Sequence, residues 1–107
     1  MTDRELLELA AKAAGMDIHA NERGLWLATE YETWVEWNPL TDDGDALRLL
    51  HDMRLSLDYD KERSHVICAD FRCGAPKVVK CDICLPDPYA ATRRAIVRAA
   101  AEIGRTM

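Results

Sequence analysis

The chain has 107 residues, of which 49% are hydrophobic and 31% are charged, and its formal charge is −5. This length fits one domain, and five glycines and four prolines argue against collagen, long disorder and low-complexity repeats. No apolar run approaches the roughly 20 residues that a membrane span needs, and the charged N-terminus lacks the pattern of a secretory signal. We therefore expect a single domain over residues 1–107 that stays in the cytoplasm.

Residues 3–14 are predicted to form the first helix. Their apolar side chains recur every three or four positions and so share one helical face: Leu6, Leu7, Leu9, Ala10, Ala11, Ala13 and Ala14. Thr2 or Asp3 can cap the N-terminus of this helix, and Gly15 favours its end.

A change of period after this helix predicts strands. Residues 31–37 alternate between side chains for a buried face, among them Val35 and Trp37, and glutamates for a solvated face. Trp34 breaks the alternation because it has the parity of the glutamates, so it either lies under a helix or is partly exposed. A shorter strand over residues 25–29 can pair with this one as a hairpin.

The middle of the chain predicts a second helix and three more strands. The helix covers roughly residues 42–53, and its apolar face consists of Ala46, Leu49, Leu50 and Met53. Leu55, Leu57 and Tyr59 then alternate with polar side chains from Arg54 onward, which predicts a strand. Two β-rich runs, 64–71 and 77–84, flank a turn at 72–76.

The last helix has the clearest signals. Asp87 is placed to cap it, Pro88 takes the first helical position, and Gly104 is expected to end it. One face carries Tyr89, Thr92, Ile96, Ala99, Ala100 and Ile103, and we expect Ile96 and Ile103 to pack against the sheet. The order α-β-β-α-β-β-β-α predicts an α+β fold with a mainly antiparallel sheet.

Three segments together resemble a family of small phage and prophage proteins, the phage ABA sandwich domain. They are E-L-L-E-L-A-A-K-A-A-G (5–15), W-N-P-L-T-D-D-G-D-A-L-R-L (37–49) and D-P-Y-A-A-T-R-R-A-I-V-R-A-A-A-E-I-G (87–104). The resemblance implies an α/β/α sandwich and a bacteriophage or prophage origin, and hence the cytoplasm of a bacterial host. It implies no activity, cofactor or catalytic residue.

Four cysteines fall within seventeen residues: Cys68, Cys73, Cys81 and Cys84. Four thiolates suit a structural zinc ion, but Cys81 and Cys84 continue a β-rich run, and residues three apart on a strand point to opposite faces. Buried, reduced cysteines are the simpler interpretation. A hairpin centred on residues 74–75 would set Cys68 nearly opposite Cys81, within reach of a disulfide, although the cytoplasm keeps thiols reduced.

Other candidates for chemistry have structural explanations. Asp42, Asp43 and Asp45 crowd the start of a predicted helix, where acids cap the helix and complement its dipole. His19, His51 and His65 lie on different elements without a nucleophile motif nearby. We therefore expect no enzyme activity and no cofactor.

The charge is divided unequally along the chain. Residues 1–60 carry five basic and fourteen acidic side chains, and residues 61–107 carry nine basic and five acidic ones. Arg93, Arg94 and Arg98 on the last helix could contact phosphates, but the acidic balance opposes nucleic acid as the ligand.

Three tryptophans within twelve residues are the remaining candidates. Trp37 has the parity of the core positions, whereas Trp34 is the candidate protein-binding residue, because tryptophan is enriched at the centres of interfaces. The sequence thus predicts a small non-catalytic phage or prophage accessory protein that binds a phage or host protein or associates with itself. The alternatives are a nucleic-acid-associated protein that uses Arg93, Arg94 and Arg98, and a zinc-stabilised module built on the four cysteines.

Overall fold

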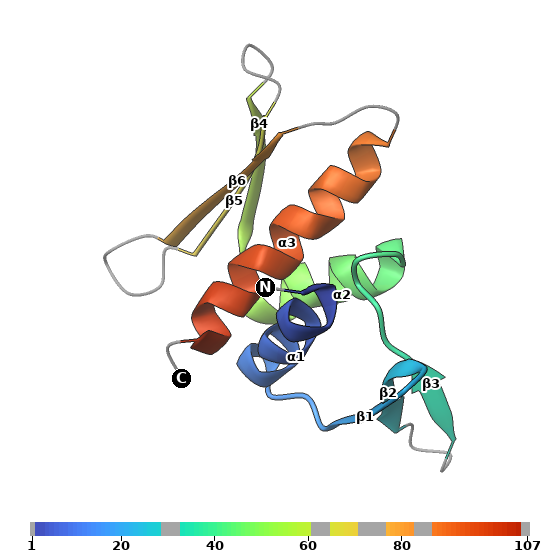
Figure 1. Ribbon diagram of the computed structural model, residues 1–107. Coiled ribbons are helices and arrows are strands. Elements are labelled where there is room, and N and C mark those ends of the chain that lie inside the picture. Colours follow the sequence, from blue (N-terminus) through green and yellow to red (C-terminus); the bar gives the residue numbers. More distant parts are fainter. Residues whose placement is uncertain (1, 29–32, 61–64, 71–76, 83–86, 106–107) are drawn as a thin grey trace.

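The computed structural model describes residues 2–28, 33–60, 65–70, 77–82 and 87–105 (Figure 1). Its elements follow the order α1 (Asp3–Ala14), β1 (Ile18–Asn21), β2 (Gly24–Ala28), β3 (Trp34–Glu36), α2 (Asp43–Met53), β4 (Ser56–Asp60), β5 (His65–Asp70), β6 (Lys77–Asp82) and α3 (Pro88–Arg105). The α+β class is confirmed, and the order matches the prediction apart from one additional strand, β1.

Side-chain caps define the helix starts as predicted. The Thr2 hydroxyl accepts a hydrogen bond from the third residue of α1, and the Asp42 carboxylate does the same for α2. Asp87 accepts two backbone N–H groups at the start of α3, each at 3.1 Å. Gly15 ends α1 with a φ of 69°, in the left-handed region that favours glycine.

Two predicted boundaries were wrong. Arg54 was assigned to a strand, but it ends α2 in the left-handed conformation with a φ of 53°, and β4 begins only at Ser56. Gly104 was expected to end α3, yet it lies inside the helix and is buried. A Cβ at Gly104 would collide with the backbone carbonyl of Leu9, so this glycine permits the close approach of α1 and α3.

Helix α3 is the centre of the molecule. It contacts α1, α2, β5 and β6, and in Figure 1 it runs between α1 and the β4–β6 sheet. Its buried residues are small apart from an isoleucine and a valine: Ala95, Ile96, Val97, Ala99, Ala100, Ala101 and Gly104. Ile96 is buried and Ile103 packs against the core, as expected for that helical face. Tyr89 lies on the same face and lines a surface groove with Thr92 and Ile96, but it is 71% exposed.

The strands form two antiparallel sheets of three, β1-β2-β3 and β4-β5-β6, instead of one sheet between helical layers. The helices pack against one another on one side of β4–β6, and β1–β3 extends away from them (Figure 1). The predicted pairing of the strand near 25–29 with the one before Trp37 is confirmed by β2 and β3, which pair Trp26 with Glu36. Tyr31 and the turn at Glu30 lie outside the described residues.

The expected register of the second hairpin was wrong. Cys68 lies opposite Val79, and Cys81 lies opposite Val66, so the two cysteines are displaced by two positions from each other's partner. The centre of this hairpin depends on the conformation of its turn, which the positions of the cysteines do not determine. The turn itself, at 72–76, lies outside the described residues.

None of the described helices is both long enough and apolar enough to cross a membrane.

Candidate functional site

The two faces of the β1–β3 sheet have different surroundings. Alternate residues point to opposite faces, so Leu25 and Trp37 share one face, and both are buried in the core. The register places His19 beside Trp26 and Trp26 beside Glu36, all on the opposite face. Trp34 has the same parity and lies opposite Ala28. We call the face that carries His19, Trp26 and Trp34 the aromatic face.

The rings of the aromatic face are held in place by contacts within the sheet. The imidazole of His19 packs on the indole of Trp34, with 5.4 Å between ring centroids and planes inclined by 50°. The indole N–H of Trp26 donates to Oδ1 of Asn21 at 3.1 Å, and the same oxygen accepts the backbone N–H of Arg23 at 2.8 Å. An open hollow of about 330 Å³ is lined by four residues of this face, His19, Asn21, Trp26 and Trp34.

Helix α1 helps to position this sheet. The guanidinium of Arg4 donates a 2.8 Å hydrogen bond to the backbone carbonyl of Asn21 at the end of β1. On the other side, the backbone N–H of Asn38, just after β3, donates to the Asp45 carboxylate of α2 at 3.0 Å. Asn21 and Asn38 lie at the same end of the sheet, on its two edge strands, so this end of the sheet is anchored to the helices.

An acidic group borders the aromatic face. The carboxylate of Glu36 lies over Gly24, because its Oε1 would be 3.8 Å from a Cβ built there. Among the described residues, no ion pair to Glu36 is present. Glu36 also lines a neighbouring polar hollow of about 350 Å³, together with Asp42, Asp45 and Arg48.

Trp34, the predicted interface residue, is 55% exposed, so no described helix covers it. His19 and Trp26 were not predicted as part of the site. Strand β1 has only four residues, Ile-His-Ala-Asn, and its apolar pattern is too short to detect. Asn21 and Gly24 could have indicated strand β1 in the sequence, because they flank a two-residue turn and favour a tight hairpin.

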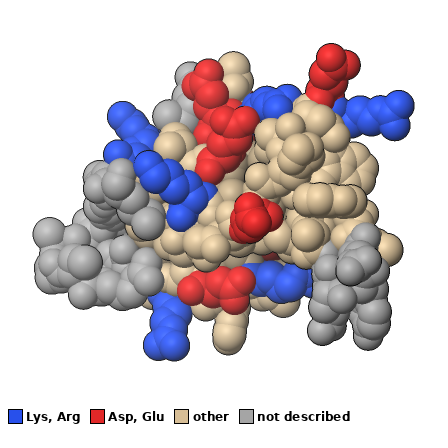
Figure 2. Space-filling model, turned by 90° about the horizontal axis from the view of Figure 1, so that it is seen from below, with Lys and Arg blue, Asp and Glu red and all other residues tan. Residues whose placement is uncertain are grey.

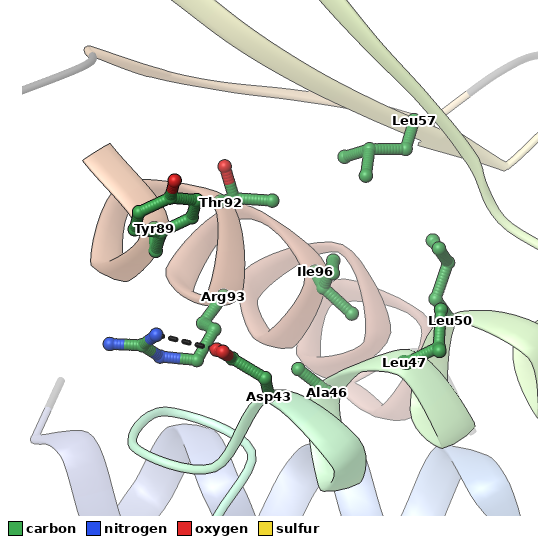
Figure 3. Close-up of a pocket in the computed structure, with 9 residues that line it drawn as sticks. All are labelled: Asp43, Ala46, Leu47, Leu50, Leu57, Tyr89, Thr92, Arg93 and Ile96. Atoms are coloured by element: carbon green, nitrogen blue, oxygen red, sulfur yellow. Dashed lines mark hydrogen bonds and ion pairs between the residues drawn. The ribbon is translucent and has the colours of Figure 1, made fainter.

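A second candidate surface is an apolar groove between α2, α3 and β4 (Figure 3). It encloses about 260 Å³, and Leu50, Leu57 and Ile96 contribute to its apolar lining. Leu47 and Tyr89, which are 64% and 71% exposed, also line it. Nothing in the structure indicates what would fill this groove.

The three arginines of the nucleic-acid alternative differ in their surroundings. The Arg93 side chain is only 15% exposed; it donates to the backbone carbonyl of Leu40 at 2.8 Å and to Asp43 at 2.7 Å (Figure 3). A weaker contact joins Arg93 to Asp87 at 3.5 Å. Arg94 pairs with Asp3 of α1 at 3.0 Å, and Arg98 is exposed. Arg93 thus joins α3 to the start of α2.

Basic side chains are dispersed over the face of the molecule shown in Figure 2. Its basic side chains are separated by acidic and uncharged ones, and the described residues form no continuous basic stripe there. Phosphate backbones are bound by clustered lysines and arginines, which neutralise several phosphates together.

The acidic cluster at the start of α2 is used within the fold. Asp42 caps the helix, and Asp43 pairs with Arg93. Asp45 accepts hydrogen bonds from the backbone N–H of Asn38 and from Arg48 at 2.7 Å, and this bond raises the pKa of Arg48 above its ordinary value. Among the described residues, no group of three or more histidine, cysteine or acidic side chains could hold a metal ion.

The cysteines are only partly described. Cys68 on β5 is fully buried, as the simpler interpretation expects. Cys73 and Cys84 lie outside the described residues, and of Cys81 only the place in β6 is described. The zinc-stabilised module therefore stays a prediction.

Comparison with protein families, with curated proteins and with solved structures gave no match for this chain.

Proposed function

We propose that this chain is a non-catalytic binding protein whose aromatic face contacts another protein or a second copy of the chain. The observation that carries the proposal is the exposure of Trp34, more than half of whose surface is open to solvent. Trp26 beside it is oriented by Asn21, so little side-chain entropy would be lost when a partner covers this face. Tryptophans held in this way are typical of the residues that dominate binding energies.

The biological setting is part of the same proposal. The resemblance of residues 5–15, 37–49 and 87–104 to the phage ABA sandwich domain supports a phage or prophage accessory protein that works in the cytoplasm of a bacterial host. The chain shares the α+β class with that family, but its two separate sheets differ from the single-sheet α/β/α sandwich that the resemblance implies. The partner is then a phage or host protein.

The contacts of the basic residues argue against the nucleic-acid alternative. Arg93 is enclosed by acceptors of its own chain, and Arg94 is paired with Asp3. A phosphate would have to compete with these groups, in a chain whose formal charge is −5.

The test is capture of proteins from bacterial lysate by the immobilised chain, comparing the wild type with Trp34→Ala and Leu47→Ala. Leu47 is the control, because it is an apolar residue of similar exposure, 64% against 55% for Trp34, and lies outside the aromatic face. We expect Trp34→Ala to lose the captured protein while Leu47→Ala retains it. Sedimentation equilibrium of the same variants measures self-association. If neither capture nor self-association depends on Trp34, the proposed function is wrong.

A further inference from the structure

The hollow of the aromatic face suits a cation better than an apolar side chain. Tryptophan rings attract cations above their faces, because the ring quadrupole is negative there. Trp26 and Trp34 supply two such rings around a hollow of about 330 Å³. Lysine and arginine carry their charge at the end of an apolar stem, so one side chain can satisfy both the rings and a nearby carboxylate.

The charge around this hollow is complementary to a basic partner. Among the described residues of 16–37, Asp17, Glu22 and Glu36 are acidic and Arg23 is basic, a formal charge of −2. The Glu36 carboxylate lies on the same face as the rings and has no ion pair among the described residues. The polar hollow on the other side of Glu36 adds little charge, because Arg48 pairs with both Asp42 and Asp45 and the Asp45 side chain is only 13% exposed.

We propose that the aromatic face binds a basic segment of its protein partner, with a lysine or arginine side chain in the hollow lined by Trp26 and Trp34. Glu36 is not part of the lining, but it lies beside Trp26 on the same face and attracts the charge of that side chain. This inference rests on the proposed function, and it adds the chemistry of the partner.

Stacked nucleobases are the main competing occupant, since bases also stack on exposed aromatic rings. Each nucleotide of a nucleic acid carries a phosphate, however, and the acidic side chains near the hollow repel phosphates. The side-chain oxygen of Asn21 already accepts two hydrogen bonds from its own sheet, so only its amide N–H groups are left to recognise a base edge.

The direct test uses a short peptide of alternating lysine and serine, titrated into the ¹⁵N-labelled chain. The readout is the NMR signals of the three indole N–H groups. We expect the Trp26 and Trp34 signals to shift and the buried Trp37 signal to stay. The affinity should fall when salt is raised from about 50 to about 200 mM, because exposed charges are then screened.

Peptide analogues separate the contribution of the lysine charge from those of its apolar stem and its N–H donors. Replacing lysine by norleucine keeps the stem and removes the charge, and we expect a loss of affinity of about two- to fivefold, the value of one exposed cation–π contact. Trimethyllysine keeps the charge without N–H donors and should bind within about threefold of lysine. A glutamate analogue should not bind.

Protein variants complete the test. Trp34→Ala should abolish the peptide-induced shifts, whereas Trp34→Phe should restore part of the affinity because a phenyl ring also attracts cations. Glu36→Gln should weaken binding about two- to fivefold and reduce its salt dependence. Leu47→Ala is the control and should bind as the wild type does.

Three results would overturn the inference. They are equal binding of the norleucine peptide, no shift of either indole signal with the lysine peptide, and tighter binding of a single-stranded oligonucleotide at the same two indoles. If lysate capture still depends on Trp34 in any of these cases, the proposed function stands and only the basic partner is rejected. If capture is independent of Trp34, the proposed function fails first.

Discussion

The helices and the β1–β3 sheet use apolar side chains in opposite ways. Around α3, alanines and Gly104 let neighbouring elements approach closely, and seven residues of this helix are buried. The β1–β3 sheet has larger side chains, and one of its faces is covered in part: Trp37 is buried, but Val35 on the same face, predicted to be buried, is 53% exposed. Trp34, on the other face, is 55% exposed. The comparison indicates that the helices and the covered face of the sheet supply stability, whereas the uncovered face is available for recognition.

The largest expected effect is the difference in the free energy of unfolding between a substitution at Trp37 and one at Trp34, which lie on opposite faces of the sheet. Trp37→Ala should lower the free energy of unfolding by about 3–5 kcal/mol, because it removes a large side chain from the core. Trp34→Ala should change it by less than about 0.5 kcal/mol, as is usual for exposed positions. Urea denaturation followed by far-UV circular dichroism measures both variants without relying on tryptophan fluorescence.

Equal destabilisation by the two substitutions would contradict this comparison of the two faces. If Trp34→Ala destabilises the chain as much as Trp37→Ala, Trp34 belongs to the core, and its effect on partner capture would be a consequence of unfolding.

The helices were predictable from the sequence because their signals are local. The 3.6-residue period, the caps at Thr2, Asp42 and Asp87, and the glycine at position 15 all act within one or two turns. Two boundary predictions failed, for different reasons. The left-handed end of α2 is occupied by Arg54, and Gly104 serves a contact with Leu9, which lies far away in the sequence.

The site was only partly predictable. The parity of Trp34 against its neighbouring glutamates predicted that it lies either under a helix or partly exposed, and the structure decides for exposure. The proximity of His19 and the orientation of Trp26 depend on the pairing of β1 with β2. Strand pairing is a non-local property, and a one-residue change of register would turn these side chains to the other face.

The close approach of α1 and α3 gives the second prediction. Gly104→Ala should destabilise the chain by about 1–3 kcal/mol, because the added methyl group meets the backbone of Leu9 and forces the helices apart. Its matched control is Gly44→Ala in α2, where the nearest atoms belong to the side chains of Asp42 and Arg48, at 3.2 and 3.3 Å.

Thermal unfolding of the two glycine variants checks this. Gly44→Ala should be neutral or stabilising by up to about 1 kcal/mol, because alanine is the better helix former and these side chains can move. Equal stabilisation by both substitutions would show that α1 and α3 do not touch at Gly104.

The smallest expected effect concerns the contact between α2 and α3. Arg93→Gln should cost about 1–2 kcal/mol, because the carbonyl of Leu40 loses its donor and Asp43 its partner in a half-buried setting. Arg94→Gln should cost less than about 0.5 kcal/mol, since its pair with Asp3 is exposed on both sides. Arg93→Lys should lose most of the same stability, because an ammonium lacks the planar fork that reaches both acceptors.

Urea midpoints at low and high salt measure all three variants. The cost of Arg93→Gln should persist in salt because one of its two main bonds goes to a neutral carbonyl. Equal, salt-sensitive losses for Arg93→Gln and Arg94→Gln would mean that both arginines are surface charges, which would reopen the case for a phosphate-binding helix.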